Sequence, residues 1–142
     1  MRQSEIVDVS SRKLAPYVLL FGLYLVFYGH ISPGGGFQGG VVLASGIILL
    51  ALSRSVRTAT TLFPVSRMRL SEAWAFCAFL GLGIVGLIAG ASFLGDFLGS
   101  TLFPGIPKHA FLIIANLIIG LKVGAGISIM CVALMSPHHE GG

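Results

Sequence analysis

Four long apolar runs, separated by short polar or basic segments, constrain this chain more than any other feature of its sequence. Hydrophobic residues make up 55% of the 142 residues, and charged residues only 10%. A soluble domain of average composition carries roughly 25% charged residues, and about 20 consecutive apolar residues suffice to cross a bilayer as a helix. The sequence therefore predicts an all-α integral membrane protein with four transmembrane helices.

The polar segments divide one membrane domain, residues 1–142, into its expected spans. These spans cover residues 12–29, 37–57, 72–94 and 110–135. Ser71 is the expected N-cap of the third span, which puts Glu72 at the positive end of that helix. Glu72 and Asp96 then mark opposite ends of the third span, so no acidic side chain is expected near the middle of the membrane.

Lysine and arginine are distributed very unevenly among the segments that connect the spans. Seven of them lie at or before the start of the first span, or from the end of the second span to the start of the third, whereas the third loop carries one. By the positive-inside rule, both termini are expected to be cytoplasmic, in a protein of the cell's cytoplasmic membrane. The net charge of +4 is thus explained by membrane orientation rather than by binding to nucleic acid.

The segment between the first two spans, residues 29–40, is the most distinctive in composition. Pro33 ends the first helix, and five glycines follow within seven residues. Gly36 and Gly40 share a helical face with Ala44, so another helix can approach closely there. His30 either titrates near neutral pH or caps the first helix by a hydrogen bond. The glycines do not resemble a phosphate site, because no strand precedes them and no P-loop lysine follows.

Lys122 lies almost midway along the fourth span, where a lysine costs about 2.5–3.5 kcal/mol on insertion scales. It must therefore face something polar. The expected partners are a carboxylate or water-filled path supplied by another subunit, or this chain's Asn116, Ser128 and backbone carbonyls. Two roles stay open, namely a proton or cation relay and a static paired charge that fixes a subunit contact.

The faces of the fourth span separate its small residues from its charge. Asn116, Gly120, Gly124 and Ser128 recur every four residues and form one close-packing side. Lys122 points about 200° away from that side. One side of the helix is thus expected to pack on another helix, and the other to meet the partner of the lysine.

Other classes of function lack the residues they need. Cys77 and Cys131 lie in apolar runs without a second ligand at metal-binding spacing, so we expect them to be buried and no metal site to be present. An intramembrane enzyme would need a nucleophile and base at one depth, but the histidines lie at the surface, in a loop or in the tail. A stand-alone small multidrug transporter would need an acidic residue within the membrane.

One motif resembles a known family closely. Its residues are Gly29, His30, Ser32, Pro33, Gly34, Gly35, Gly36, Phe37, Gln38, Gly39 and Gly40. In this order they resemble the signature of the MnhB-type subunit of Mrp (Mnh) multisubunit sodium/proton antiporters, and the resemblance extends over nearly the whole chain. It implies a small transporter subunit with no catalytic centre or cofactor of its own, whose partners are the other subunits of a large membrane complex.

The resemblance also implies two settings for such a subunit. Equivalent subunits occur in the antiporter-like modules of membrane-bound hydrogenases and related sulfur reductases, and the glycine motif does not separate these settings. Some antiporter members carry an acidic residue in the region of Lys122, which keeps the ferredoxin-driven respiratory setting open. Lys122, His30 and Asn116 are the candidates for an ion path, and a purely structural scaffold is the alternative.

Overall fold

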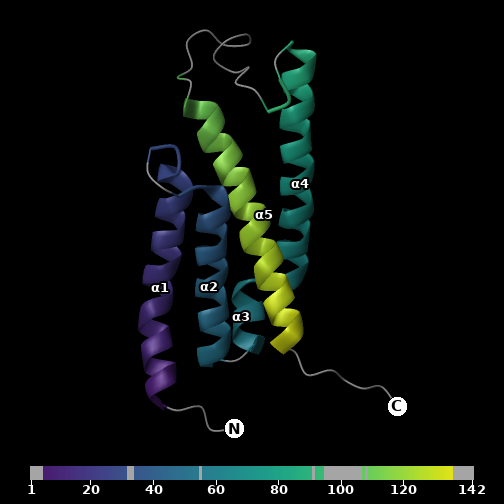
Figure 1. Ribbon diagram of the computed structural model, residues 1–142. Coiled ribbons are helices and arrows are strands. Elements are labelled where there is room, and N and C mark those ends of the chain that lie inside the picture. Colours follow the sequence, from purple (N-terminus) through teal and green to yellow (C-terminus); the bar gives the residue numbers. More distant parts are fainter. Residues whose placement is uncertain are drawn as a thin grey trace, which may run out of the picture.

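The computed structural model describes residues 5–31, 34–54, 56–90, 92–94, 107 and 109–135. Within these ranges every regular element is a helix (Figure 1). The helices are α1 (Glu5–Tyr28), α2 (Gly36–Arg54), α3 (Val56–Leu62), α4 (Val65–Ile88) and α5 (His109–Met135). Four of them, all except α3, are long and apolar enough to cross a membrane. The expected all-α membrane protein with four apolar helices is confirmed.

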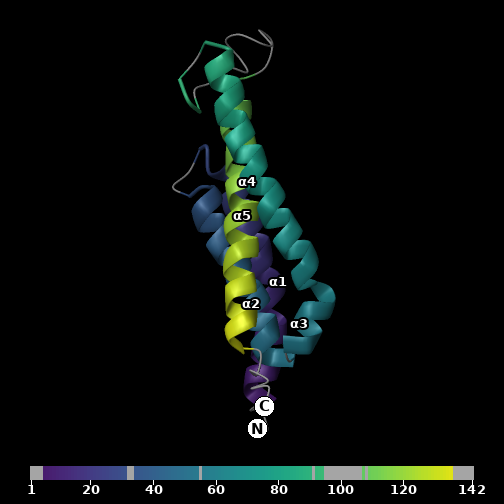
Figure 2. The same cartoon turned by 90° about the vertical axis from the view of Figure 1, so that its right-hand side faces the viewer.

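The long helices form an array with α2 and α5 at its centre. Helix α2 packs against α1 on one side and α5 on the other, while α4 packs mainly on α5. The start of α1, the end of α5 and the short α3 lie at one end of the array (Figure 1). Helices α2 and α5 therefore run parallel, whereas α1 is antiparallel to α2 and α4 is antiparallel to α5. Helix α4 lies obliquely across α5 and is the most peripheral (Figure 2).

Helix α4 begins earlier and ends earlier than the expected span 72–94. Pro64 occupies its N-cap position with φ −61°, and the Met68 N–H donates to the Pro64 carbonyl at 3.0 Å. Proline's fixed φ and missing N–H suit a helix start, so Pro64 starts this helix as well as ending the preceding segment. Gly90, with φ +78°, follows the last turn as a left-handed glycine commonly does. Ser71, expected as the N-cap, lies inside α4, where its hydroxyl donates to the Met68 carbonyl.

The connection between the second and third expected spans also differs from the expectation. Helix α2 ends at Arg54 rather than at residue 57, and the chain then forms the short helix α3. The Thr61 hydroxyl donates to the Arg57 carbonyl at 2.6 Å within this short helix. Helix α1 likewise begins at Glu5 instead of residue 12, and an Asp8–Arg12 ion pair four residues apart stabilises its first turns. Helix α5 differs from its expected bounds by one residue.

Exposure on α4 corrects one further expectation. Cys77 is exposed and Cys131 is partly buried, although both were expected to be buried. Because α4 packs mainly on α5, most of its circumference is open to lipid or to another subunit. No group of three or more metal-binding side chains is found among the described residues.

Candidate functional site

The turn between α1 and α2 depends on glycine at two positions. Gly35 has φ +137°, a backbone conformation that side-chain-bearing residues rarely adopt. A Cβ at Gly29 would collide with the Cα of Gly35 and lie 2.7 Å from its nitrogen. The two ends of the turn are thus in direct backbone contact. Ser32 and Pro33 of the motif lie outside the described residues.

Helix α2 uses glycines on two faces to approach both neighbours. On the α1 side, a Cβ at Gly39 would collide with Val26 and lie 3.0 Å from the Gly22 carbonyl oxygen. On the α5 side, a Cβ at Gly40 would lie 2.7 Å from the Gly120 carbonyl oxygen. A Cβ at Gly36 would collide with the α5 backbone in the same way. The expected close packing of the second span is confirmed.

Asn116 belongs to this packed region. Its side-chain oxygen Oδ1 accepts a hydrogen bond from the Gly36 N–H at 3.2 Å. The first N–H groups of a helix lack partners within the helix, so this amide stabilises the start of α2 from a neighbouring helix. Ser128, fully buried, donates to the Gly124 carbonyl of its own helix at 2.6 Å. Both side chains suggested as partners of Lys122 therefore lie on the packing side of α5.

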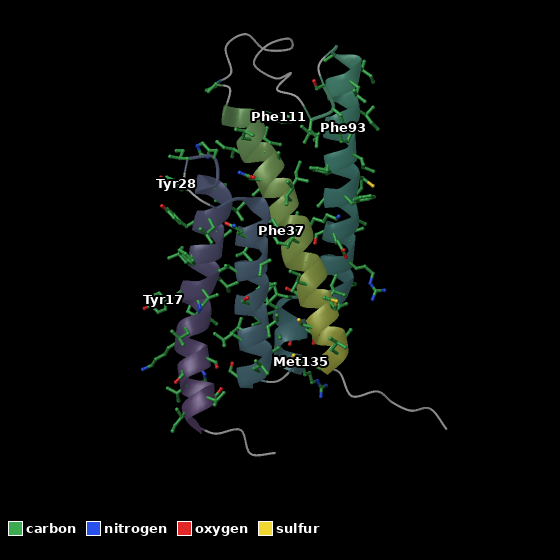
Figure 3. The ribbon with its side chains drawn as sticks, viewed as in Figure 1. Tyr17, Tyr28, Phe37, Phe93, Phe111 and Met135 are labelled. Carbon is green, nitrogen blue, oxygen red and sulfur yellow. The ribbon has the colours of Figure 1, made fainter. Side chains whose placement is uncertain are left out.

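Among the motif residues that the structure describes, Phe37 and Gln38 face outward. The side chain of Phe37 is 63% exposed near the start of α2 (Figure 3). The glycines on either side turn inward, so the same helical turn fixes the packing and presents an aromatic ring to the surroundings.

His30 is partly buried at the end of α1, and its Nδ1 lies 3.0 Å from the Phe27 carbonyl oxygen. A carbonyl oxygen only accepts, so Nδ1 donates in this contact. The last carbonyls of a helix have no partner within the helix. This geometry is that of a cap on the α1 C-terminus, one of the two roles expected for His30.

Lys122 is the central residue of α5 and lies on the side that faces α4. Its Nζ is 4.8 Å from the centroid of the Phe76 ring, near the middle of α4. A cation over an aromatic ring gains about 0.5–1 kcal/mol when exposed and about 2 kcal/mol when desolvated. This gain is smaller than the about 2.5–3.5 kcal/mol that a central lysine costs. The ring therefore compensates only part of that cost.

Glu72 lies on the same interface, one helical turn from Phe76. Its Oε1 is 3.0 Å from the position that a Cβ on Gly126 would occupy. Gly126 is in turn one helical turn from Lys122. Because α4 and α5 are antiparallel, Glu72 faces Gly126, and Phe76 faces Lys122. The first facing pair is about 6 Å from the second along the helix axes.

Glu72 was expected at the end of the third span, but it lies inside α4, which begins at Val65. With α4 centred on a hydrocarbon core of ~30 Å, Glu72 is roughly 7 Å from the midplane. The sequence signal that could have found it was Pro64, since a helix that begins there carries Glu72 roughly two turns inside. Phe76 was missed as well, because helical spacing does not tell which residue of a neighbouring helix lies opposite.

A cavity of about 380 Å³ lies beside the glycine contacts, between the start of α4 and the central helices. Apolar side chains such as Leu43, Ile47 and Met68 line it, together with Arg67 and Ser71. Its lining offers a volume for alkyl groups but few oxygen ligands for a cation. The charged side chains of Glu72 and Lys122 lie instead at the α4–α5 interface.

The fold and the site define a membrane protein whose central helices are joined by glycine contacts and which holds opposite charges at an interhelical interface. Residues 6–129 match a family model described as "Domain related to MnhB subunit of Na+/H+ antiporter". The chain belongs to this family, which confirms the resemblance of its glycine motif.

Several relatives support this assignment. The chain is 34% identical over 103 residues to the MnhB-type Na(+)/H(+) antiporter subunit of Bacillus subtilis, covering 72% of this chain and 71% of the relative. It is 35% identical over 95 residues to "Putative antiporter subunit mnhB2" of Staphylococcus haemolyticus, covering 66% and 67%. An uncharacterized protein of Methanocaldococcus jannaschii is 34% identical over 118 residues, 78% of this chain and 44% of that protein.

One solved structure is similar as well, a chain of "the membrane-bound sulfane sulfur reductase (MBS), an archaeal respiratory membrane complex". The similarity has a TM-score of 0.73 and 30% identity, over 96% of this chain and 60% of that chain. The fold of four long helices is thus shared with a subunit of a respiratory complex.

Proposed function

We propose that this chain is the MnhB-type subunit of a multisubunit sodium/proton antiporter in the cytoplasmic membrane, where it supports assembly and ion exchange. The match of residues 6–129 to the antiporter subunit family carries the proposal. The glycine hairpin that the motif encodes lies within that match. In this role the chain is a transporter subunit with no catalytic centre or cofactor of its own.

The proposed orientation places both termini in the cytoplasm. Basic side chains at the start of α1, on α3 and at the start of α4 support it, since these segments lie at one end of the array (Figure 1). Cytoplasmic segments carry an excess of lysine and arginine. The glycine hairpin then faces the outside of the cell.

The glycine motif serves assembly in this proposal. Its inward glycines fix α1, α2 and α5 against one another, and its outward Phe37 ring is available to contact a partner subunit. Large aromatic side chains are frequent anchors of such contacts.

Lys122 is the best supported of the three ion-path candidates, because it is a charged side chain at the centre of α5. Ionisable residues within membrane spans commonly mark ion or proton pathways. His30 and Asn116 contact the backbone at the ends of α1 and α2, so their proposed part is to hold the helices that carry the path.

The test is sodium-dependent proton exchange in inverted vesicles that contain the complex with or without this chain. We expect exchange to require the chain, because the family is one of antiporter subunits. Phe37→Ala is expected to lower exchange while the subunit remains inserted, and Tyr17→Ala, which removes an exposed ring from α1, is its control. Full exchange without the chain would refute the function, and full exchange by Phe37→Ala would refute the role of that ring.

A second candidate is a subunit of a respiratory complex with an antiporter-like module. The similarity to the chain of the sulfane sulfur reductase complex favours it. Purification of the complex through a tag on this chain would decide between the two. Iron–sulfur absorption that copurifies in fixed ratio supports the respiratory setting, whereas a complex without it supports the free antiporter.

A further inference from the structure

We propose that Glu72 and Lys122 form a proton-exchanging pair across the α4–α5 interface inside the membrane, beside the ring of Phe76. This inference rests on the proposed function and deepens it. It gives Lys122 an acidic partner within its own chain. The sequence had suggested a carboxylate or water-filled path of another subunit, or this chain's Asn116, Ser128 and backbone carbonyls.

The two charges lie on facing helices. Glu72 and Phe76 lie one turn apart on α4, opposite Gly126 and Lys122, which lie one turn apart on α5. Gly126 permits this arrangement, because its Cα carries no side chain at the point where the Glu72 carboxylate approaches α5. A Cβ there would be 3.0 Å from Oε1, closer than ordinary van der Waals contact, and would push the carboxylate back.

Other charges are scarce at this interface. Residues 36–53 of α2 contain no acidic, basic or histidine side chain, and Lys122 is the only charged residue from 110 to 135 of α5. Helix α4 adds Arg67 and Arg69 near its start, and both are exposed. The remaining titratable residues on these two helices are His109, the first residue of α5, Cys77, which is exposed, and Cys131.

In the structure the two charged groups are not in contact with each other. Among the described residues, neither Glu72 nor Lys122 forms an ion pair, and the ammonium group rests on the Phe76 ring instead. Glu72 and Lys122 are about 6 Å apart along the direction of the helix axes. Lysine has a flexible four-carbon stem with several rotatable bonds. Rotation of that stem past the Phe76 ring brings the ammonium group to the carboxylate.

Contact allows a balanced proton transfer. One N–H bond of the Lys122 ammonium breaks, and the proton bonds to a carboxylate oxygen of Glu72, so both side chains become neutral. Neutral groups lose less solvation than charges in an apolar interior, which favours the transfer there. Glu72 lies closer than Lys122 to the α3 end of the array, so the proton moves along the length of the helices (Figure 1).

The experiment uses the whole complex in inverted vesicles and measures sodium-dependent proton exchange with assembly quantified in parallel. The variants are Glu72→Gln, Lys122→Met and the double variant. Arg69→Gln, which removes a charge three residues from Glu72, is the matched control. We expect the exchange rate to fall about a hundredfold in both single variants and in the double variant. This is the lower end of the rate loss seen when a positioned proton-transferring side chain is removed. Arg69→Gln is expected to exchange like the native complex.

The double variant separates a relay from a static ion pair. A static pair needs only mutual neutralisation, so the double variant would then exchange normally, and that result would overturn the inference. Normal exchange by Glu72→Gln together with loss in Lys122→Met would also overturn it while leaving the proposed function intact. No exchange by the native complex would refute the proposed function itself.

A further variant covers the case in which Glu72→Gln fails to assemble. Glu72→Asp keeps the charge but withdraws the carboxylate by one methylene group. A relay predicts slower exchange and a changed pH profile for this variant, because the transfer distance has grown. An unchanged rate and pH profile would overturn the inference.

Discussion

Gly40→Ala tests whether close backbone contact between α2 and α5 holds the central helices together. The added Cβ would lie 2.7 Å from the Gly120 carbonyl oxygen, 2.9 Å from Val123 Cβ and 3.1 Å from the Gly124 nitrogen. Two of these three atoms belong to the backbone, so the helices must move apart. Overpacking of this kind costs about 1–3 kcal/mol.

A matched control is available on α4. A Cβ at Gly81 would meet no atom within 4 Å, so Gly81→Ala changes helix propensity without changing packing. Alanine is favoured over glycine in a helix by up to about 1 kcal/mol, and both variants share this gain. The difference in unfolding free energy between them therefore isolates the packing cost, about 1–3 kcal/mol.

The assay is unfolding of the purified full chain in mixed micelles, followed by far-ultraviolet circular dichroism during titration with dodecyl sulfate. We expect Gly40→Ala to unfold at lower dodecyl sulfate than the native chain, and Gly81→Ala at an equal or higher amount. Equal stability of the two variants would refute the reasoning, because the α2–α5 contact would then tolerate a methyl group.

Two further predictions concern the amide cap and the orientation. Asn116→Leu removes the acceptor of the Gly36 N–H and is expected to cost about 1–3 kcal/mol in the same titration. Asn116→Asp keeps the acceptor and should retain most of the stability, and equal loss in both variants would count against the cap. In a chain without its native cysteines, Ile31→Cys should react with an impermeant maleimide from outside the cell and Arg57→Cys only from inside. The reverse pattern would invert the proposed topology.

The glycine packing was predictable from the sequence because it is periodic along single helices. The small residues of the second span share one face, and those of the fourth recur every four residues. These patterns identify the sides that allow close approach, and the structure pairs them as Gly36 and Gly40 with the backbone around Asn116 and Gly120. The position of Lys122 opposite the packing side of α5 follows from the same periodicity.

The partner of Lys122 could not be predicted in this way. Which residue lies opposite Lys122 depends on the position of α4 along the axis of α5. That position follows from the residue at which α4 begins and from the geometry of the segment between α4 and α5. Reading Ser71 as the N-cap placed Glu72 at the membrane surface, whereas the start at Pro64 places it inside the helix. A shift of about two turns at one helix start thus changed which charges face each other.

Whether the aromatic rings of α1 are buried or exposed could not be predicted from the sequence for a similar reason. The rings of Tyr17, Phe21, Tyr24 and Tyr28 share a face, as their spacing predicts, and Tyr24 stacks on Tyr28 at 4.8 Å. These rings are exposed instead of packing on the other helices of this chain. Periodicity shows that side chains share a face, but it does not show whether the neighbour of that face belongs to the same chain.

The central claim is that Lys122 takes part in ion exchange by the complex. The most direct measurement compares sodium-dependent proton exchange between Lys122→Ala and the native complex in inverted vesicles, at equal assembly. If Lys122 takes part in ion exchange, exchange is lost while the complex stays intact. Unchanged exchange would contradict this role and would reduce this subunit to a scaffold, with the ion path in its partners.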